Sequence, residues 1–199
     1  MSSKRLKQFV FPYSVGVDRE TLIVVDSTPY SITRPHHGRQ IVRIIQRNTR
    51  GELSSQGMTE ICSNVGGDTI SFAQVFRHTI SYEVQADACA ALTHNLRQYG
   101  LLDKVTVLCQ PFSDQDITTP GVYIDPPWEG STGVDAHVCL GPTPIFLLAR
   151  RILERNSAVD WIVLKLPPHH SVPTTLRYKK YLLKPKRNVM ILFIKRRVL

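Results

Sequence analysis

A short apolar stretch that stops at two prolines is the feature that most constrains the fold of this chain. Residues 121–128 read Gly-Val-Tyr-Ile-Asp-Pro-Pro-Trp. We expect a strand over 121–125, because each proline fixes φ and lacks the backbone N–H that a continuing strand needs. The Asp125 carboxylate is then left at a sheet edge, with Trp128 just beyond it.

Such an arrangement suits one kind of ligand. The Asp125 carboxylate and the Pro126 carbonyl can accept hydrogen bonds from an exocyclic amine, while the indole of Trp128 holds a planar base. The alternative is an ordinary strand followed by a Pro-Pro turn, with Trp128 in the core. Both interpretations stay open from this stretch alone.

A glycine-rich bend precedes this stretch. A predicted strand over 58–62 leads through Gly66 and Gly67 into a predicted helix, which is the order that a nucleotide-type cofactor loop needs. The next predicted strand, 79–83, ends in Glu83, and a carboxylate at that position binds ribose hydroxyls in such folds.

The remaining pattern alternates strands and helices. We expect helices over 85–99 and 144–155, a helix starting near Pro35 with Ser31 or Thr33 as its N-cap, strands over 22–25, 104–109 and 159–166, and a terminal hairpin over 178–183 and 188–194. This alternation predicts an α/β fold with a mainly parallel sheet and helices on both faces. Phe9, Phe11 and Tyr13 occupy alternate positions, which indicates an edge strand or an arm whose aromatic rings stack on bases; we expect this segment to pack against the domain.

Length and composition limit the class of protein. A chain of 199 residues with 42% hydrophobic and 21% charged residues indicates one globular domain. No apolar run reaches the roughly 20 residues of a membrane span, and the N-terminus lacks the apolar segment of a signal peptide. The four cysteines have no CxxC spacing, so we expect buried free thiols in a reducing compartment, an intracellular location, and no zinc or other metal.

Positive charge is concentrated near the C-terminus. The net charge is +9, and residues 177–199 contain nine Lys or Arg and no acidic residue. A polyanionic partner is the natural inference, with a solvated basic face as the alternative. The predicted helix after Pro35 has the same ambiguity, because its arginines gather on the side opposite its isoleucines.

Several stretches, taken in order, resemble a class I S-adenosylmethionine-dependent methyltransferase. They are Glu60-Ile-Cys-Ser-Asn-Val-Gly-Gly-Asp-Thr69, Glu83 and Asp125-Pro-Pro-Trp128. Within this class the chain is most similar to the trimethylguanosine synthases, which methylate N2 of the 7-methylguanosine cap of RNA. Tyr30-Ser-Ile-Thr33 is similar to the lead-in of that family, and the resemblance covers about residues 27–128.

The resemblance implies a Rossmann-like, seven-stranded sheet over residues 31–199, preceded by an extension over 1–30. It implies S-adenosylmethionine as cofactor, S-adenosylhomocysteine as product and capped RNA as partner. The cofactor residues that it implies are Thr33, Glu60, Asn64, Gly66, Gly67, Glu83, Phe112 and Asp125. Asp125, Pro126 and Trp128 would carry the reaction, and Trp128, Glu129 and Lys165 would bind the substrate. Asn95 resembles a structural asparagine of the family.

The chain departs from the family pattern at two places. Ser63-Asn64 stands where a glycine is usual, and Gln110-Pro111 stands where the family has Gly-Asp. The acidic contact of the family then comes from Asp114 or is absent. Two other functions therefore stay open: an N-methyltransferase acting on internal guanine or adenine of RNA or DNA, and an inactive methyltransferase-like RNA-binding or scaffold subunit. A compact chain of this kind also suits a viral or unicellular source.

Overall fold

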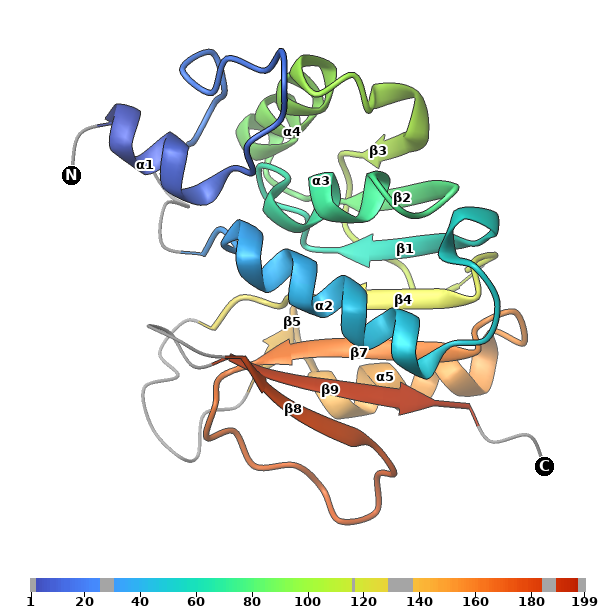
Figure 1. The fold of residues 1–199 in the computed structure, drawn as a ribbon. Coiled ribbons are helices and arrows are strands. Elements are labelled where there is room, and N and C mark those ends of the chain that lie inside the picture. The colour runs from blue at the N-terminus through green and yellow to red at the C-terminus, as the bar shows by residue number, and fades with distance from the viewer. Residues whose placement is uncertain (1–2, 26–30, 116, 129–137, 184–188, 197–199) are drawn as a thin grey trace.

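A seven-stranded sheet in the order β3-β2-β1-β4-β7-β9-β8 forms the centre of the molecule (Figure 1). The computed structural model describes residues 3–25, 31–115, 117–128, 138–183 and 189–196. The parallel strands are β1 Gly57–Ile61, β2 His78–Tyr82, β3 Val105–Leu108, β4 Gly121–Ile124 and β7 Trp161–Leu166. The antiparallel strands are β8 Lys179–Leu183 and β9 Val189–Lys195. The predicted Rossmann-like α/β fold is confirmed.

The central strands are buried because helices cover both faces of the sheet. On one face, Tyr123 and Val163 pack against α2 Pro35–Asn48 and α3 Gly67–Ala73. On the other face, Ile124 and Leu164 pack against α5 Ile145–Arg155. Helix α4 Ala86–Gln98 packs against α3 and β3, in a cluster with Leu92 and Val105. Side chains therefore alternate between two cores along β4 and β7, as the strand period requires.

Short elements complete the chain. They are the helix α1 Ser3–Val10, the 3-10 turns Leu53–Ser55 and Leu102–Lys104, and the two-stranded ribbon of β5 Cys139–Leu140 and β6 Thr143–Pro144. None of the helices in the described ranges has the length and apolarity that a membrane span requires.

The first residues form a helix, so the predicted edge strand is wrong, while the expected packing of this segment against the domain is confirmed. Residues 3–10 are α1, and Leu6 and Val10, one turn apart, face the cluster that holds Phe11. The helical period outweighs the alternation of the aromatic residues, because one face of α1 packs on the domain. Phe9 and Tyr13 are exposed.

Residues 22–25 are not a strand either, which corrects a second prediction. The side chain of Asn95 takes the place of a neighbouring strand: its Oδ1 accepts from the Ile23 N–H (2.8 Å) and its Nδ2 donates to the Ile23 carbonyl (2.9 Å). Asn95 also donates to the Val65 carbonyl (2.9 Å) and is fully buried. The structural role expected for this asparagine agrees with these contacts.

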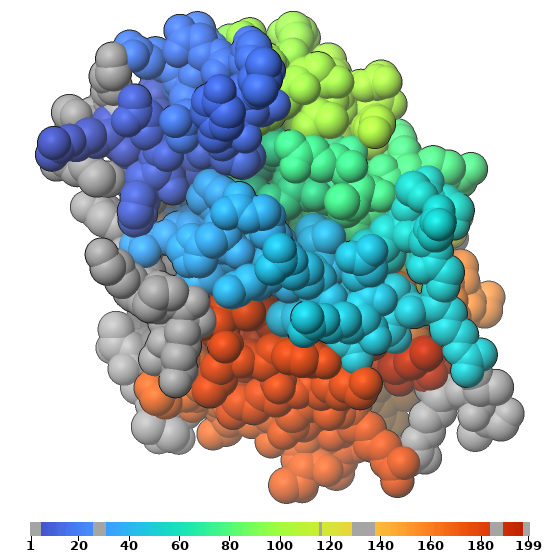
Figure 2. Space-filling view, viewed as in Figure 1, coloured from blue at the N-terminus to red at the C-terminus, as the bar shows by residue number. Residues whose placement is uncertain are grey.

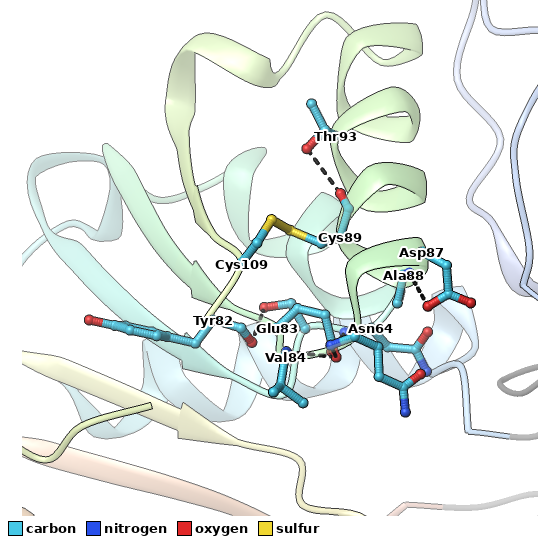
Figure 3. Close-up of a disulfide and its surroundings, with 11 residues drawn as sticks. Asn64, Tyr82, Glu83, Val84, Asp87, Ala88, Cys89, Thr93 and Cys109 are labelled. Carbon is cyan, nitrogen blue, oxygen red and sulfur yellow. Dashed lines mark hydrogen bonds between the residues drawn. A yellow bond between two sulfur atoms is a disulfide. The ribbon is translucent and has the colours of Figure 1, made fainter. Parts of the chain in front are cut away.

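Two of the four cysteines form a disulfide, so the prediction of free thiols is wrong for this pair. Cys89 on α4 is joined to Cys109 after β3, with 5.8 Å between the Cα atoms (Figure 3). Cys62 and Cys139 are free. Sequence spacing cannot show this pairing, because α4 and the end of β3 meet only in the folded sheet. The inference of a reducing compartment therefore loses its basis.

Candidate active site

A cavity of about 990 Å³ opens at the carboxyl ends of β1, β2, β4 and β7. Ligands of open parallel sheets bind at this end of the strands. Its wall includes most of the predicted site residues that the structure describes: Thr33, Asn64, Glu83, Phe112, Asp125, Pro126, Trp128 and Lys165. Phe9 and Val10 of α1 also line it, so the predicted N-terminal extension contributes to the wall.

Glu83 is held rigidly at one end of the cavity. It follows β2 directly, and its N–H donates to the Leu108 carbonyl (3.1 Å). One carboxylate oxygen accepts from the Asn64 N–H (2.7 Å), and the other accepts from the N–H groups of Val84 and Gln85 (2.9 Å each) (Figure 3). Three backbone donors fix this carboxylate while it is 8% exposed.

An aromatic pair lies beside Glu83. The rings of Tyr82 and Phe112 pack edge to face with centroids 5.2 Å apart, and both residues line the cavity. Asp114, the predicted substitute acid, also lines it, but its carboxylate accepts from the guanidinium groups of Arg151 (2.9 Å) and Arg155 (3.3 Å). The negative charge of Asp114 is therefore compensated by two arginines of the protein itself.

Asp125 stands at the centre of a buried polar network. Its N–H donates to the Ile61 carbonyl (3.2 Å), which ties the end of β4 to β1. Its Oδ2 accepts from Lys165 Nζ (2.5 Å), and Lys165 also donates to the Thr33 hydroxyl (2.5 Å). The Thr33 hydroxyl donates in turn to Asp68 Oδ2 (2.5 Å). Strand ends and the lead-in to α2 are thus joined through one ammonium group.

Burial and charge act in opposite directions on this network. Burial raises the pKa of Asp125 and Lys165 opposes the rise, so the pKa stands at about 6. Burial lowers the pKa of Lys165, but the carboxylates of Asp125 and Asp68 outweigh it and hold that pKa above its ordinary value. At neutral pH the Lys165–Asp125 pair is therefore ionised.

Trp128 lies in the wall beside this pair. Lys165 Nζ is 5.7 Å from the centre of the indole, and the ring also packs against both cores of the sheet. Trp128 thus borders the apolar core and the cavity at once. Its predicted stacking and the predicted contact of Lys165 with a cap phosphate stay predictions, while Tyr30 and Glu129 lie outside the described residues.

Three predicted cofactor residues do not line the cavity. Glu60 is 1% exposed and accepts from the Ser81 hydroxyl (2.9 Å); burial, followed by the charge of Asp68, raises its pKa to about 8. Gly66 has φ +98°, and a Cβ on Gly67 would lie 2.7 Å from a methyl of Ile32. These glycines are needed for a left-handed turn and for close packing of α3 under residues 31–33.

The unusual residues of the loop after β1 do not block the cavity. Ser63 does not line it, and its hydroxyl donates to the Tyr82 carbonyl (3.1 Å). Asn64 adopts φ +51°, a left-handed conformation that asparagine tolerates better than most residues. Thr33 is not the N-cap of α2: that position is Arg34, and the Thr33 hydroxyl is bound to Asp68 instead.

Sequence reasoning missed three buried polar residues at this site. Asp68 is 5% exposed and also accepts from the Tyr123 hydroxyl (2.8 Å). His37 lines the cavity, and burial, His36 and Lys165 lower its pKa to about 4, so its imidazole is neutral. Asp68 in the Gly-Gly-Asp stretch and Tyr123, two residues before Asp125, carried a usable signal, whereas His37 carried none.

The order of the strands and a buried carboxylate after the second of them fit an S-adenosylmethionine-dependent methyltransferase of the Rossmann-like class. Comparison with known families then identifies the group within this class. The profile described as RNA cap guanine-N2 methyltransferase matches residues 56–196, and the chain belongs to this family.

Comparisons with individual proteins give one viral relative and solved structures that share the fold. An uncharacterized protein of Acanthamoeba polyphaga mimivirus is 20% identical over 194 residues, covering 83% of this chain and 74% of the relative. The fold is similar to that of a SAM-dependent O-methyltransferase from Thermotoga maritima (TM-score 0.55, 14% identity, 83% of this chain and 68% of that one). A dimethyladenosine transferase from Plasmodium falciparum is similar as well (TM-score 0.57, 12% identity, 82% and 62%).

Proposed function

We propose that this protein transfers a methyl group from S-adenosylmethionine to the N2 amine of a 7-methylguanosine cap on RNA. The observation that carries the proposal is the wall formed by Asp125, Pro126 and Trp128, with Lys165 ion-paired to Asp125 inside the cavity. Membership of the cap guanine-N2 family supports the same substrate.

The residues around the cavity fit the methyl donor. A carboxylate offers about four lone-pair sites. Three backbone N–H groups fill three of the sites of Glu83, so one site remains for a ribose hydroxyl. The rings of Tyr82 and Phe112 give an apolar surface for adenine. When bound, S-adenosylmethionine supplies a methyl group already activated by a positive sulfur.

Trp128 gives the site its preference for a methylated cap. A 7-methylguanine base is cationic and planar, and stacking it on an indole in a desolvated cavity is worth about 1–2 kcal/mol. The ammonium of Lys165 does not repel this cation as a free charge would, because Asp125 compensates it at 2.5 Å. An unmethylated guanosine cap lacks the positive charge and binds more weakly.

Asp125 and the Pro126 carbonyl orient the amine. Both accept hydrogen bonds from N–H groups, so that the nitrogen lone pair is directed away from them and toward the cofactor half of the cavity. A strong base is unnecessary, because the amine proton becomes acidic as the nitrogen is alkylated. Asp125, with a pKa of about 6, is ionised at neutral pH and accepts the proton that the alkylated amine releases.

The test is methyl transfer to a 7-methylguanosine cap dinucleotide, followed by mass spectrometry of the product and digestion to nucleosides. The expected product carries its new methyl group on N2, and the unmethylated guanosine dinucleotide gives little product. Methylation of internal nucleobases without reaction at the cap would contradict the proposal, and so would cofactor binding without any methyl transfer.

A further inference from the structure

Helix α2 lies across the face of the molecule that Figure 2 shows, and its two ends line two different hollows, the candidate active site and a second groove. His37 in its first turn lines the active-site cavity, and Asn48 at its last position lines a groove of about 390 Å³. His37 and Asn48 are 11 positions apart in this helix, so they lie about 16 Å apart along its axis at a rise of about 1.5 Å per residue.

A row of arginines follows the exposed side of α2 between the two hollows. Arg39, Arg43 and Arg47 are spaced four residues apart, and all three are exposed. Like charges at this spacing destabilise a helix by about 0.2–0.5 kcal/mol per pair. Within the part of the chain that the structure describes, none of the three has a carboxylate within ion-pair distance. An external anion would relieve this repulsion.

The groove at the far end of α2 combines basic and aromatic side chains. We call it the basic groove; its lining residues are Asn48, Arg177, Tyr178, Lys179, Phe193, Lys195 and Arg196. The ring-bearing side chain of Tyr178 is 37% exposed. Proteins that bind single-stranded nucleic acids combine a positively charged groove with an accessible aromatic ring: the phosphates contact the charges and a base stacks on the ring.

The helix end is fastened to the basic groove. The Asn48 amide donates to the Tyr181 hydroxyl (2.9 Å), and Lys179 Nζ donates to Asn48 Oδ1 (2.8 Å). These contacts hold α2 and β8 together, so the arginine row and the groove form one continuous basic surface. Arg196 is a structural part of it, since its guanidinium donates to the carbonyls of Val159 and Asn156.

We propose that the arginine row and the basic groove bind the RNA chain that follows the capped nucleotide. The phosphates lie along Arg39, Arg43 and Arg47, and a base downstream stacks on Tyr178 in the groove. This inference rests on the proposed function, because the cap in the active-site cavity sets the starting point of the track.

The test compares two probes: a 7-methylguanosine cap dinucleotide and a capped single-stranded RNA of about ten nucleotides, a length within the range of single-stranded sites. The double variant R43E/R47E is expected to bind the long RNA on the order of tenfold more weakly and to reduce its salt slope by about 1.4, at about 0.7 per lost phosphate contact. Tyr178→Ala is expected to weaken binding of the long RNA as well. Neither change alters the affinity for the dinucleotide.

The matched control is R77E/K104E, which reverses two exposed charges near the amino ends of β2 and β3, at the other edge of the sheet. Equal losses in the control and in R43E/R47E would overturn the proposal, and so would a wild-type protein that binds the long RNA no more tightly than the dinucleotide. If the dinucleotide does not bind at all, the proposed function fails instead. An uncapped RNA then tests the track, which survives only if R43E/R47E still weakens binding and the control does not.

Discussion

Two opposing effects act on the Asp125 carboxylate: burial disfavours its charge, and the ammonium group of Lys165 stabilises it. Lys165 is 5% exposed and contacts both Asp125 and Thr33, so it cannot turn to solvent without breaking two hydrogen bonds. Removing one partner of a buried ion pair leaves the other charge uncompensated. Lys165 is therefore a positioning residue for Asp125, and its effect is visible as a shift in pH dependence.

Lys165→Met is expected to move the acid limb of the pH–rate profile to higher pH. Because Lys165 lowers the pKa of Asp125, its loss raises that pKa above about 6, and a higher pH is needed to ionise the carboxylate. The measurement is the rate of methyl transfer to the cap dinucleotide across pH. Lys180→Met, on the exposed side of β8, is the control. An acid limb that stays in place would show that Asp125 is not the titrating group.

Trp128→Ala is expected to weaken binding of the cap dinucleotide by about five- to thirtyfold, which corresponds to about 1–2 kcal/mol of lost stacking. Cofactor binding stays within a few-fold, because Glu83 and Phe112 follow other strands, β2 and β3. Calorimetry with S-adenosylhomocysteine and with the dinucleotide separates the two affinities, and Trp128→Phe is expected to restore part of the loss. Joint loss of both ligands would contradict this division of the cavity.

Glu60→Gln is expected to flatten the pH dependence of stability. The pKa of Glu60 is raised from an ordinary 4.5 to about 8, so the native state favours the protonated form. Its contribution to the free energy of unfolding is complete below about pH 4.5 and is lost as pH rises through about 8. Urea unfolding at several pH values measures this. Parallel curves for the wild type and the variant would contradict the assignment to Glu60.

At the scale of the elements, the sequence signals were strongest where a strand ends at a functional residue. The strands before Glu83 and Asp125 and the helix after Pro35 lie close to their predicted positions, because hydrophobic period and proline act locally. Residues 22–25 were misjudged because a side chain, Asn95, satisfies their backbone from another element.

The polar network around Lys165 could not be predicted from the sequence, because its members also come from elements far apart in the chain. Lys165 and Thr33 are 132 residues apart, and only the packing of α2 across the sheet brings them together. A buried lysine in an apolar strand could be recognised as unusual, but its partners could not be named. The Cys89–Cys109 disulfide could not be predicted either, because only the contact between α4 and the end of β3 brings the two cysteines together.

Cys109→Ala is expected to lower the free energy of unfolding by about 3 kcal/mol, since the disulfide closes a loop with a sequence separation of 20. Chemical denaturation measures the change, and Cys139→Ala, a free cysteine, is the control. Alkylation and mass spectrometry of the wild type, before and after reduction, are expected to reveal two additional reactive thiols. A full count of reactive thiols before reduction would contradict the pairing.

At the scale of the whole molecule, part of the positive charge is gathered on and around α2. The net charge of +9 includes the arginine row on α2 and the basic groove beside β8, and the two are neighbours because Asn48 at the end of α2 lines the groove. The candidate active site opens at one end of that helix. The proposed RNA track depends on this distribution, which attracts a polyanion by its charge and places the start of the track beside the cavity.

The central claim is that one cavity holds the methyl donor and a methylated cap together. Its most direct test is calorimetric titration of the protein, saturated with S-adenosylhomocysteine, with a 7-methylguanosine cap dinucleotide. The account predicts micromolar binding of both ligands, and much weaker binding of the unmethylated dinucleotide. Binding of S-adenosylhomocysteine without binding of the cap would contradict the account and favour an internal nucleobase as substrate.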